Sequence, residues 1–167
     1  MSDEFLPPAE AALATTKTVR PSVVRAVWKG EHLFDTGKPN GPPARLDGSG
    51  ATAQTPPEAL LSALSSCSGV DLVDFLAKRR TPVEKLTIDV VAGRRELHPR
   101  RFEHIVVTYH VDGANIERTH AERAVQLAFE RYCSVAASLA PDIVIETLVV
   151  LNGEEGPTVR QAMFVGP

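Results

Sequence analysis

Cysteine is scarce in this sequence. Only two of its 167 residues are cysteines, Cys67 and Cys133. A chain of this length can bury the core of one ordinary domain without disulfide cross-links. Because a reducing compartment keeps thiols reduced, we expect any bridge between the two cysteines to be transient.

Basic charge and long hydrophobic runs are lacking as well. Eighteen Lys and Arg residues stand against 21 Asp and Glu residues, which gives a formal net charge of -3. This balance predicts no binding to nucleic acid or to anionic lipid. The sequence has no continuous apolar run long enough to span a membrane, and its first residues are acidic where a secretory signal is basic. We therefore expect a cytoplasmic protein with no membrane partner.

Motifs for cofactors are also missing. The Asp-Gly-Ser-Gly segment at 47–50 does not stand in the context of a phosphate-binding loop or a dinucleotide-binding loop. The histidines are scattered without the spacing of metal ligands, at positions 32, 98, 104, 110 and 120. We therefore predict no cofactor and no metal. Asp71, His104 and His110 leave a hydrolase or metal site only as the weakest alternative.

The residues that are present predict an α+β fold. Runs rich in β-branched residues predict strands at 22–28, 31–34, 86–91, 102–111 and 143–151. Two proline-poor stretches predict helices at 58–80 and 116–139. The first helix carries so many apolar residues that we expect it to be buried on more than one side. We divide the chain into an N-terminal arm, a folded domain and a C-terminal tail, at 1–20, 21–152 and 153–167.

Each cysteine is placed inside one of the predicted helices. Cys67 lies in the segment Leu64-Ser65-Ser66-Cys67-Ser68-Gly69, whose small side chains leave room beside the sulfur. Such room serves either close helix packing or the access of a substrate, and the residues themselves leave both readings open. Cys133 lies two positions after Arg131, and a guanidinium that points toward a sulfur stabilises its thiolate.

Two segments together resemble the OsmC/Ohr family. The first is similar to the family's helix start, Pro-Pro-Glu-Leu-Leu-x-x-Ala-x-x-x-Cys. In this chain it reads Thr55-Pro56-Pro57-Glu58-Ala59-Leu60-Leu61-Ser62-Ala63-Leu64-Ser65-Ser66-Cys67. The second is similar to the family's Glu-Lys-Tyr-Cys-Pro-Val segment. In this chain it reads Glu130-Arg131-Tyr132-Cys133-Ser134-Val135. The resemblance runs from about Ser22 to Leu151. It implies an OsmC-like fold, in which two long central helices pack against antiparallel β-sheets in an intertwined homodimer.

The resemblance also implies a thiol peroxidase that reduces organic hydroperoxides in defence against oxidative or osmotic stress. Cys67 would attack the peroxide, and Cys133 would resolve the resulting sulfenic acid into a disulfide. A free thiol is mostly protonated at neutral pH, so the reaction needs a positive neighbour. By position Arg45 matches the activating arginine, with Arg25 as the fallback, and Glu58 matches the glutamate that holds it. A dithiol or a lipoyl protein would regenerate the enzyme.

A non-enzymatic function stays open beside this one. The same fold would then serve a dimer that binds a small molecule or senses the redox state. Glu58 also has a plain structural reading, because a carboxylate in the first helical turn stabilises the helix dipole.

Overall fold

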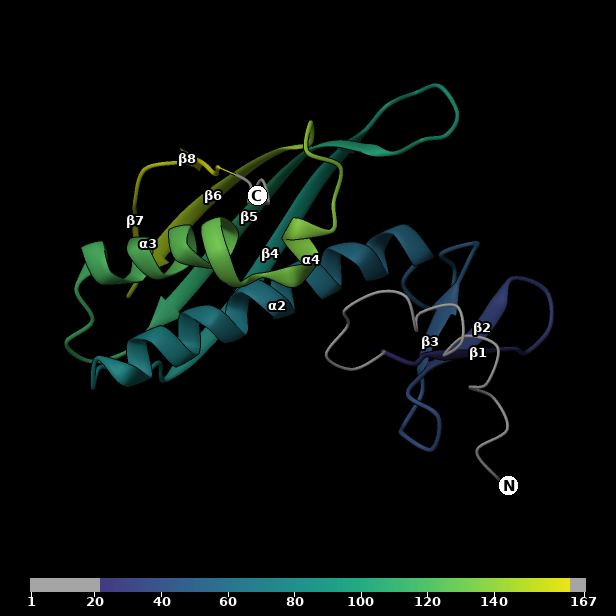
Figure 1. Ribbon diagram of the computed structural model, residues 1–167, viewed down its shortest axis with the longest axis horizontal. Coiled ribbons are helices and arrows are strands. Elements are labelled where there is room, and N and C mark those ends of the chain that lie inside the picture. The colour runs from purple at the N-terminus through teal and green to yellow at the C-terminus, as the bar shows by residue number, and fades with distance from the viewer. Residues whose placement is uncertain (1–21, 163–167) are drawn as a thin grey trace, which may run out of the picture. The chain divides into compact units, whose positions relative to one another are not determined.

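The computed structural model describes residues 22–162 of the chain (Figure 1). The predicted arm at 1–20 and the last residues of the predicted tail lie outside these residues. The chain divides into two compact units. The first unit ends at Pro56 and the second begins at Pro57.

The first unit is a three-stranded antiparallel sheet. Its strands are β1 (Arg25–Trp28), β2 (Leu33–Gly37) and β3 (Ala44–Asp47), in that order. The strands predicted at 22–28 and 31–34 are found as β1 and β2, which form a hairpin in which Lys29 N–H donates to the Leu33 carbonyl at 2.9 Å. Gly30 has a φ of 105°, a conformation that side chains disfavour and that glycine adopts freely.

Asp47 organises the loop after β3. Its carboxylate accepts hydrogen bonds from the backbone N–H of Ser49 (2.8 Å) and of Thr52 (2.9 Å), and from both hydroxyls. These bonds, the one from the Ser49 hydroxyl first, hold the pKa of Asp47 well below its usual range. The Asp-Gly-Ser-Gly segment is therefore part of a loop that its own aspartate holds in place.

The second unit contains the larger sheet. Its main strands are β4 (Lys85–Arg94), β5 (Phe102–Asp112) and β6 (Val144–Leu151), and two short strands, β7 (Glu154–Glu155) and β8 (Val159–Arg160), pair with β6. β4 and β5 form an antiparallel hairpin, whereas β5 and β6 run parallel. The parallel pairing follows from the helical segment that connects β5 to β6 and lies on the same face of the sheet as α2 (Pro56–Lys78) (Figure 1).

Helix α2 supplies much of the core. Leu64, Leu72 and Leu76 are fully buried, in one cluster with the inward-facing residues of β5. By length and composition alone α2 could cross a membrane, but the core helix of a soluble domain meets the same test. We expected α2 to be buried on more than one side, but on the side opposite the sheet Leu60, Val70 and Val73 are exposed within the single chain.

The second predicted helix is not continuous. It consists of α3 (Arg118–Leu127), a π-helical turn η1 (Ala128–Tyr132) and a short α4 (Ser134–Ala137). Cys133 was predicted inside a helix, and this is wrong: its backbone is extended, with φ -69° and ψ 98°. The wide turn explains the break, since Cys133 N–H donates to the carbonyl of Ala128, five residues earlier, at 2.8 Å.

Candidate functional site

The two cysteines, far apart in the sequence, are neighbours in the second unit. Cys67 lies midway along α2, and Cys133 is the N-cap of α4. The Cys67 sulfur lies 4.0 Å from the hydroxyl oxygen of Ser134, the residue that follows Cys133. Cys67 is also close enough to the Cys133 thiol to contribute to its raised pKa. Both thiols are free, so the structure shows the reduced pair.

The two sulfurs lie in different environments. Cys133 is only 3% exposed, whereas Cys67 is partly open to solvent. Burial first, and then the nearby Cys67, raise the pKa of Cys133 to about 12, although the Ala136 N–H that donates to its sulfur at 3.4 Å acts in the opposite direction. At neutral pH Cys133 is therefore a protonated thiol, and Cys67 is the sulfur that a dissolved molecule can reach.

Two buried hydroxyls lie next to the cysteine pair. The hydroxyls of Ser68 and Tyr109 are 2.6 Å apart, and Ser68 donates to the Leu64 carbonyl at 2.9 Å. A serine has one proton to donate, so the Tyr109 hydroxyl is the donor in the shared bond. Burial raises the pKa of Tyr109, and the bond to Ser68 opposes this shift. The pair connects α2 to β5 directly beside Cys67.

This assignment of donor and acceptor makes the two hydroxyls unequal for stability. We expect Ser68→Ala to lower the free energy of unfolding by about 1–3 kcal/mol, because it leaves the Tyr109 hydroxyl buried without a partner. Tyr109→Phe should cost only about 0.5–1.5 kcal/mol, because Ser68 keeps its bond to Leu64. Urea unfolding of the two variants measures this order, and the reverse order would show that the donor assignment is wrong.

Asp71 is a carboxyl group one helical turn after Cys67. Its Oδ2 atom is buried and makes no hydrogen bond with the residues that the structure describes. Burial, and then repulsion by Asp74, raise the pKa of Asp71. Asp71 lines a cleft of about 210 Å³ between α2 and the α3–η1 segment, together with residues that include Phe75 and Tyr132.

The structure places the predicted activating residues as follows. Arg45 lies on β3 in the first unit, where its guanidinium makes two bonds to Asp35, at 2.8 and 3.0 Å. This ion pair raises the pKa of Arg45 and lowers that of Asp35. Glu58 lies in the first turn of α2, in the second unit, and the fallback Arg25 begins β1. The pairing of Arg45 with Glu58 and with Cys67 stays a prediction.

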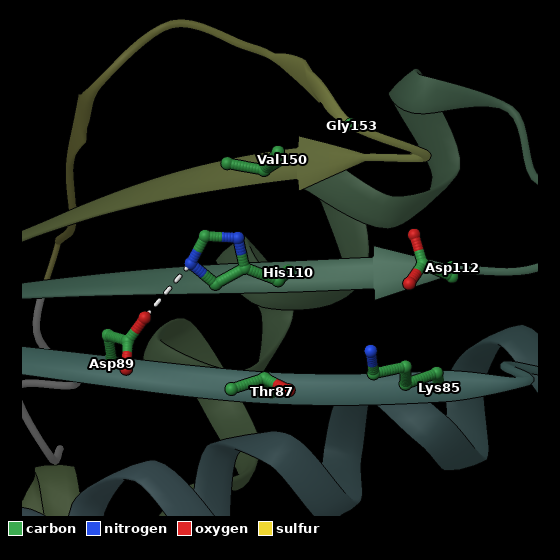
Figure 2. Close-up of a pocket in the computed structure, with 7 residues that line it drawn as sticks. All are labelled: Lys85, Thr87, Asp89, His110, Asp112, Val150 and Gly153. Atoms are coloured by element: carbon green, nitrogen blue, oxygen red, sulfur yellow. Dashed lines mark hydrogen bonds and ion pairs between the residues drawn. The ribbon is translucent and has the colours of Figure 1, made fainter.

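The histidines of the weakest alternative lie away from the cysteines. His104 and His110 are on the face of the sheet opposite α2, and each bonds a carboxylate: Glu146 at 2.7 Å and Asp89 at 3.0 Å. Figure 2 shows His110 and Asp89 in an open depression of about 410 Å³ on that face. Asp71 lies on α2 and does not join them. Within residues 22–162, no three His, Cys, Asp or Glu residues are grouped to hold a metal ion.

Sequence reasoning found both cysteines but missed the groups around them. Ser134 stands where the family segment has proline, and its hydroxyl contacts the Cys67 sulfur. Ser68 and Tyr109 gave no signal, because a serine in a helix and a tyrosine in a strand are common. Tyr109 does alternate with buried β5 residues, and this spacing alone could have placed it against α2.

The chain is similar to known proteins in sequence and in fold. The model of the family described as OsmC-like protein matches residues 48–148. Protein YhfA of Escherichia coli is 40% identical over 95 residues, which cover 56% of this chain and 71% of YhfA. A hypothetical protein from Aquifex aeolicus has the same fold, with a TM-score of 0.72 and 29% identity over 80% of this chain and 97% of its own.

A further solved structure is the organic hydroperoxide resistance protein OhrB of Bacillus subtilis. It matches with a TM-score of 0.52 and 17% identity, over 81% of this chain and all (100%) of its own. This likeness concerns the fold alone. The family match covers both cysteine segments and most of the second unit. The OsmC-like α+β fold that its two motifs implied is confirmed, whereas the homodimer stays a prediction. The chain therefore belongs to the OsmC-like protein family.

Proposed function

We propose that this protein is a thiol peroxidase that reduces organic hydroperoxides with Cys67 and Cys133. One observation carries the proposal: a partly exposed thiol and a buried thiol of raised pKa are neighbours in the reduced state. The exposed sulfur can meet a peroxide, and the buried one is protected from it. The OhrB likeness supports the fold on which such chemistry occurs, and its name gives the substrate class of that protein.

The proposed cycle has three balanced steps. The Cys67 thiolate attacks one peroxide oxygen, the O–O bond breaks, and the leaving oxygen takes up a proton as an alcohol, while Cys67 becomes a sulfenic acid. Cys133 then attacks the sulfenic sulfur, and a disulfide and water form. A dithiol, free or carried as a lipoyl group on a protein, returns both cysteines to thiols and becomes a disulfide itself.

Ser134 and Asp71 fit this cycle in different ways. The Ser134 hydroxyl is close enough to the Cys67 sulfur to donate a weak hydrogen bond to a thiolate. A charged Asp71 would oppose a nearby thiolate. Because burial raises the pKa of Asp71, this carboxyl keeps its proton to a higher pH and opposes the thiolate less.

We propose Arg45 as the activating cation, held by Glu58. Arg45→Ala should slow peroxide consumption at least about tenfold, or about 1.4 kcal/mol on the barrier, because the thiolate loses its positive neighbour. Stopped-flow consumption of cumene hydroperoxide by the pre-reduced protein measures the rate. Asp35→Asn is the control, since it breaks the same ion pair but leaves the guanidinium in place. Equal losses of rate in both variants would show that Arg45 acts only through its ion pair with Asp35 and does not activate the thiol.

We also propose that the working form is a homodimer. The side of α2 turned away from the sheet is apolar and uncovered in the single chain, with Val70 60% exposed. We expect light scattering to give twice the 18.0 kDa chain mass. Val70→Asp should shift the protein to monomers, whereas Val91→Asp, which changes an exposed valine of β4, should not. A wild-type monomer would contradict the proposal.

One observation favours a second candidate, a dimer of the same fold that senses the redox state without turning over peroxide. Asp71 is a carboxyl group beside the nucleophile, and any charge that it carries slows thiolate formation. In this case Cys67 would react with peroxide slowly and without saturation, and no reductant would restore it at a useful rate. The same stopped-flow experiment separates the two candidates.

A further inference from the structure

The loop between β4 and β5 carries an unusual density of arginine. The Arg94–Arg101 loop, which is taken to include Arg94 as the last residue of β4, contains four arginines against one acidic residue, Glu96, in a chain whose formal net charge is -3. Figure 1 shows this loop extending beyond the strands that it joins. The cysteine site uses none of its residues.

Three of the arginines are held by the loop's own backbone. The Nε atom of Arg94 donates to the carbonyl of Arg100 at 2.6 Å, that of Arg95 to Pro99 at 2.6 Å, and that of Arg100 to Glu96 at 3.2 Å. None of the three forms an ion pair with a carboxylate within residues 22–162. Within the described part of the chain no carboxylate therefore neutralises their positive charge, and the Nη donors of each guanidinium have no hydrogen-bond acceptor there.

The fourth arginine is used differently. Arg101 makes a two-pronged ion pair with Asp142, in the segment before β6, and this contact anchors the base of the loop. The Arg94 guanidinium also lies 5.7 Å from the centre of the Phe102 ring, a cation–π contact with a nearly buried side chain. These contacts restrict the loop and its arginines before any ligand arrives, which lowers the entropy cost of binding.

The three arginines that lack carboxylate partners line one open depression. It has a volume of about 540 Å³, and its lining residues are Arg94, Arg95, Glu96 and Arg100. Guanidinium groups bind phosphate oxygens through paired hydrogen bonds, and three of them match a ligand with several negative charges. The rest of the chain has more acidic than basic residues, which disfavours a long polyanion, so a compact ligand fits better.

We propose that the Arg94–Arg101 loop binds a compact phosphate-bearing anion, of the kind that carries two or three linked phosphates. This site is independent of the peroxidase proposal. Glu96 is the one group in the depression that opposes such a ligand. We therefore expect the loss of the Glu96 charge to strengthen binding of the anion and the loss of the arginine charges to weaken it.

Calorimetric titration of the full chain with inorganic tripolyphosphate, at 50 and 150 mM salt, tests the proposal. We expect saturable binding, one anion per chain, that weakens at the higher salt. The variant R94Q/R95Q/R100Q should lose at least tenfold in affinity, and Glu96→Gln should gain about threefold or more. The control K38Q/R80Q/R160Q removes three exposed cations elsewhere in the chain and should bind as the wild type does.

Several results would overturn the proposal. Absence of saturable binding by the wild type would do so, and so would equal weakening in both triple variants, which would show attraction by net charge alone. Tighter binding of a short single-stranded DNA than of tripolyphosphate would point to a different class of ligand. If the triple variant fails to fold, NMR of the wild-type protein replaces it. The Nε–Hε signals of Arg94, Arg95 and Arg100 should shift when tripolyphosphate is added. Signals that do not move would contradict the site.

Discussion

Cys67→Ser should abolish rapid reaction with organic hydroperoxide. A serine hydroxyl is not ionised at neutral pH and cannot accept the peroxide oxygen as a thiolate does, so we expect at least about a hundredfold loss in rate, or about 2.7 kcal/mol on the barrier. The second sulfur does not replace the first, because Cys133 is buried and its pKa is raised to about 12. Stopped-flow mixing of the pre-reduced variant with cumene hydroperoxide measures the loss.

The matched control is Ser66→Ala, which changes the neighbouring α2 residue. The Ser66 hydroxyl bonds only carbonyls of its own helix within the described chain, at 2.8 and 3.3 Å. We therefore expect this variant to keep the wild-type rate within about twofold, since lost local bonds of this kind change little beyond the helix. A Cys67→Ser protein as fast as this control would show that the nucleophile lies elsewhere.

Cys133→Ser should leave the first reaction intact and stop the cycle. Cys67 can still attack one peroxide, but no second sulfur is present to form the disulfide, so the sulfenic acid persists or is oxidised further. We expect a single turnover at the wild-type rate, then almost no consumption with excess dithiol. Mass spectrometry should find one added oxygen on Cys67. A variant that turns over at the wild-type rate would show that Cys133 takes no part in the cycle.

The raised pKa of Cys133 adds a pH dependence to the wild-type resolving step. Disulfide formation needs the Cys133 thiolate, and its fraction grows about tenfold per pH unit below the pKa. Because that pKa is about 12, the step should still be accelerating at pH 9. A rate that levels off near the pH of an ordinary thiol would show that Cys133 leaves its buried position before it reacts.

Local patterns were enough to predict most of the fold. The apolar density of α2 and its prolines in the first turn located that helix to within two residues at each end. The alternation in β5 located a strand with one buried face. The break at Cys133 could not be found, because the stretch from Arg118 to Leu139 contains no proline or glycine to interrupt a helix, and only the π-helical turn shows that Cys133 leaves it.

The site was predictable only as far as its cysteines. Their motifs identified both, since each stands in a segment with a family pattern. The ion pair of Arg45 with Asp35 could not be read from the sequence, because it depends on the register of β2 and β3, which places these two residues opposite each other. The hydroxyl pair of Ser68 and Tyr109 depends likewise on how α2 lies across β5.

The most direct test of the central claim is intact-protein and peptide mass spectrometry after one equivalent of cumene hydroperoxide is added to the reduced protein. We predict a rapid loss of two hydrogens and one linked peptide pair that joins Cys67 to Cys133. A protein that keeps both thiols free after the peroxide is added, or that forms a disulfide only between different chains through Cys67, would contradict the peroxidase cycle proposed for this chain.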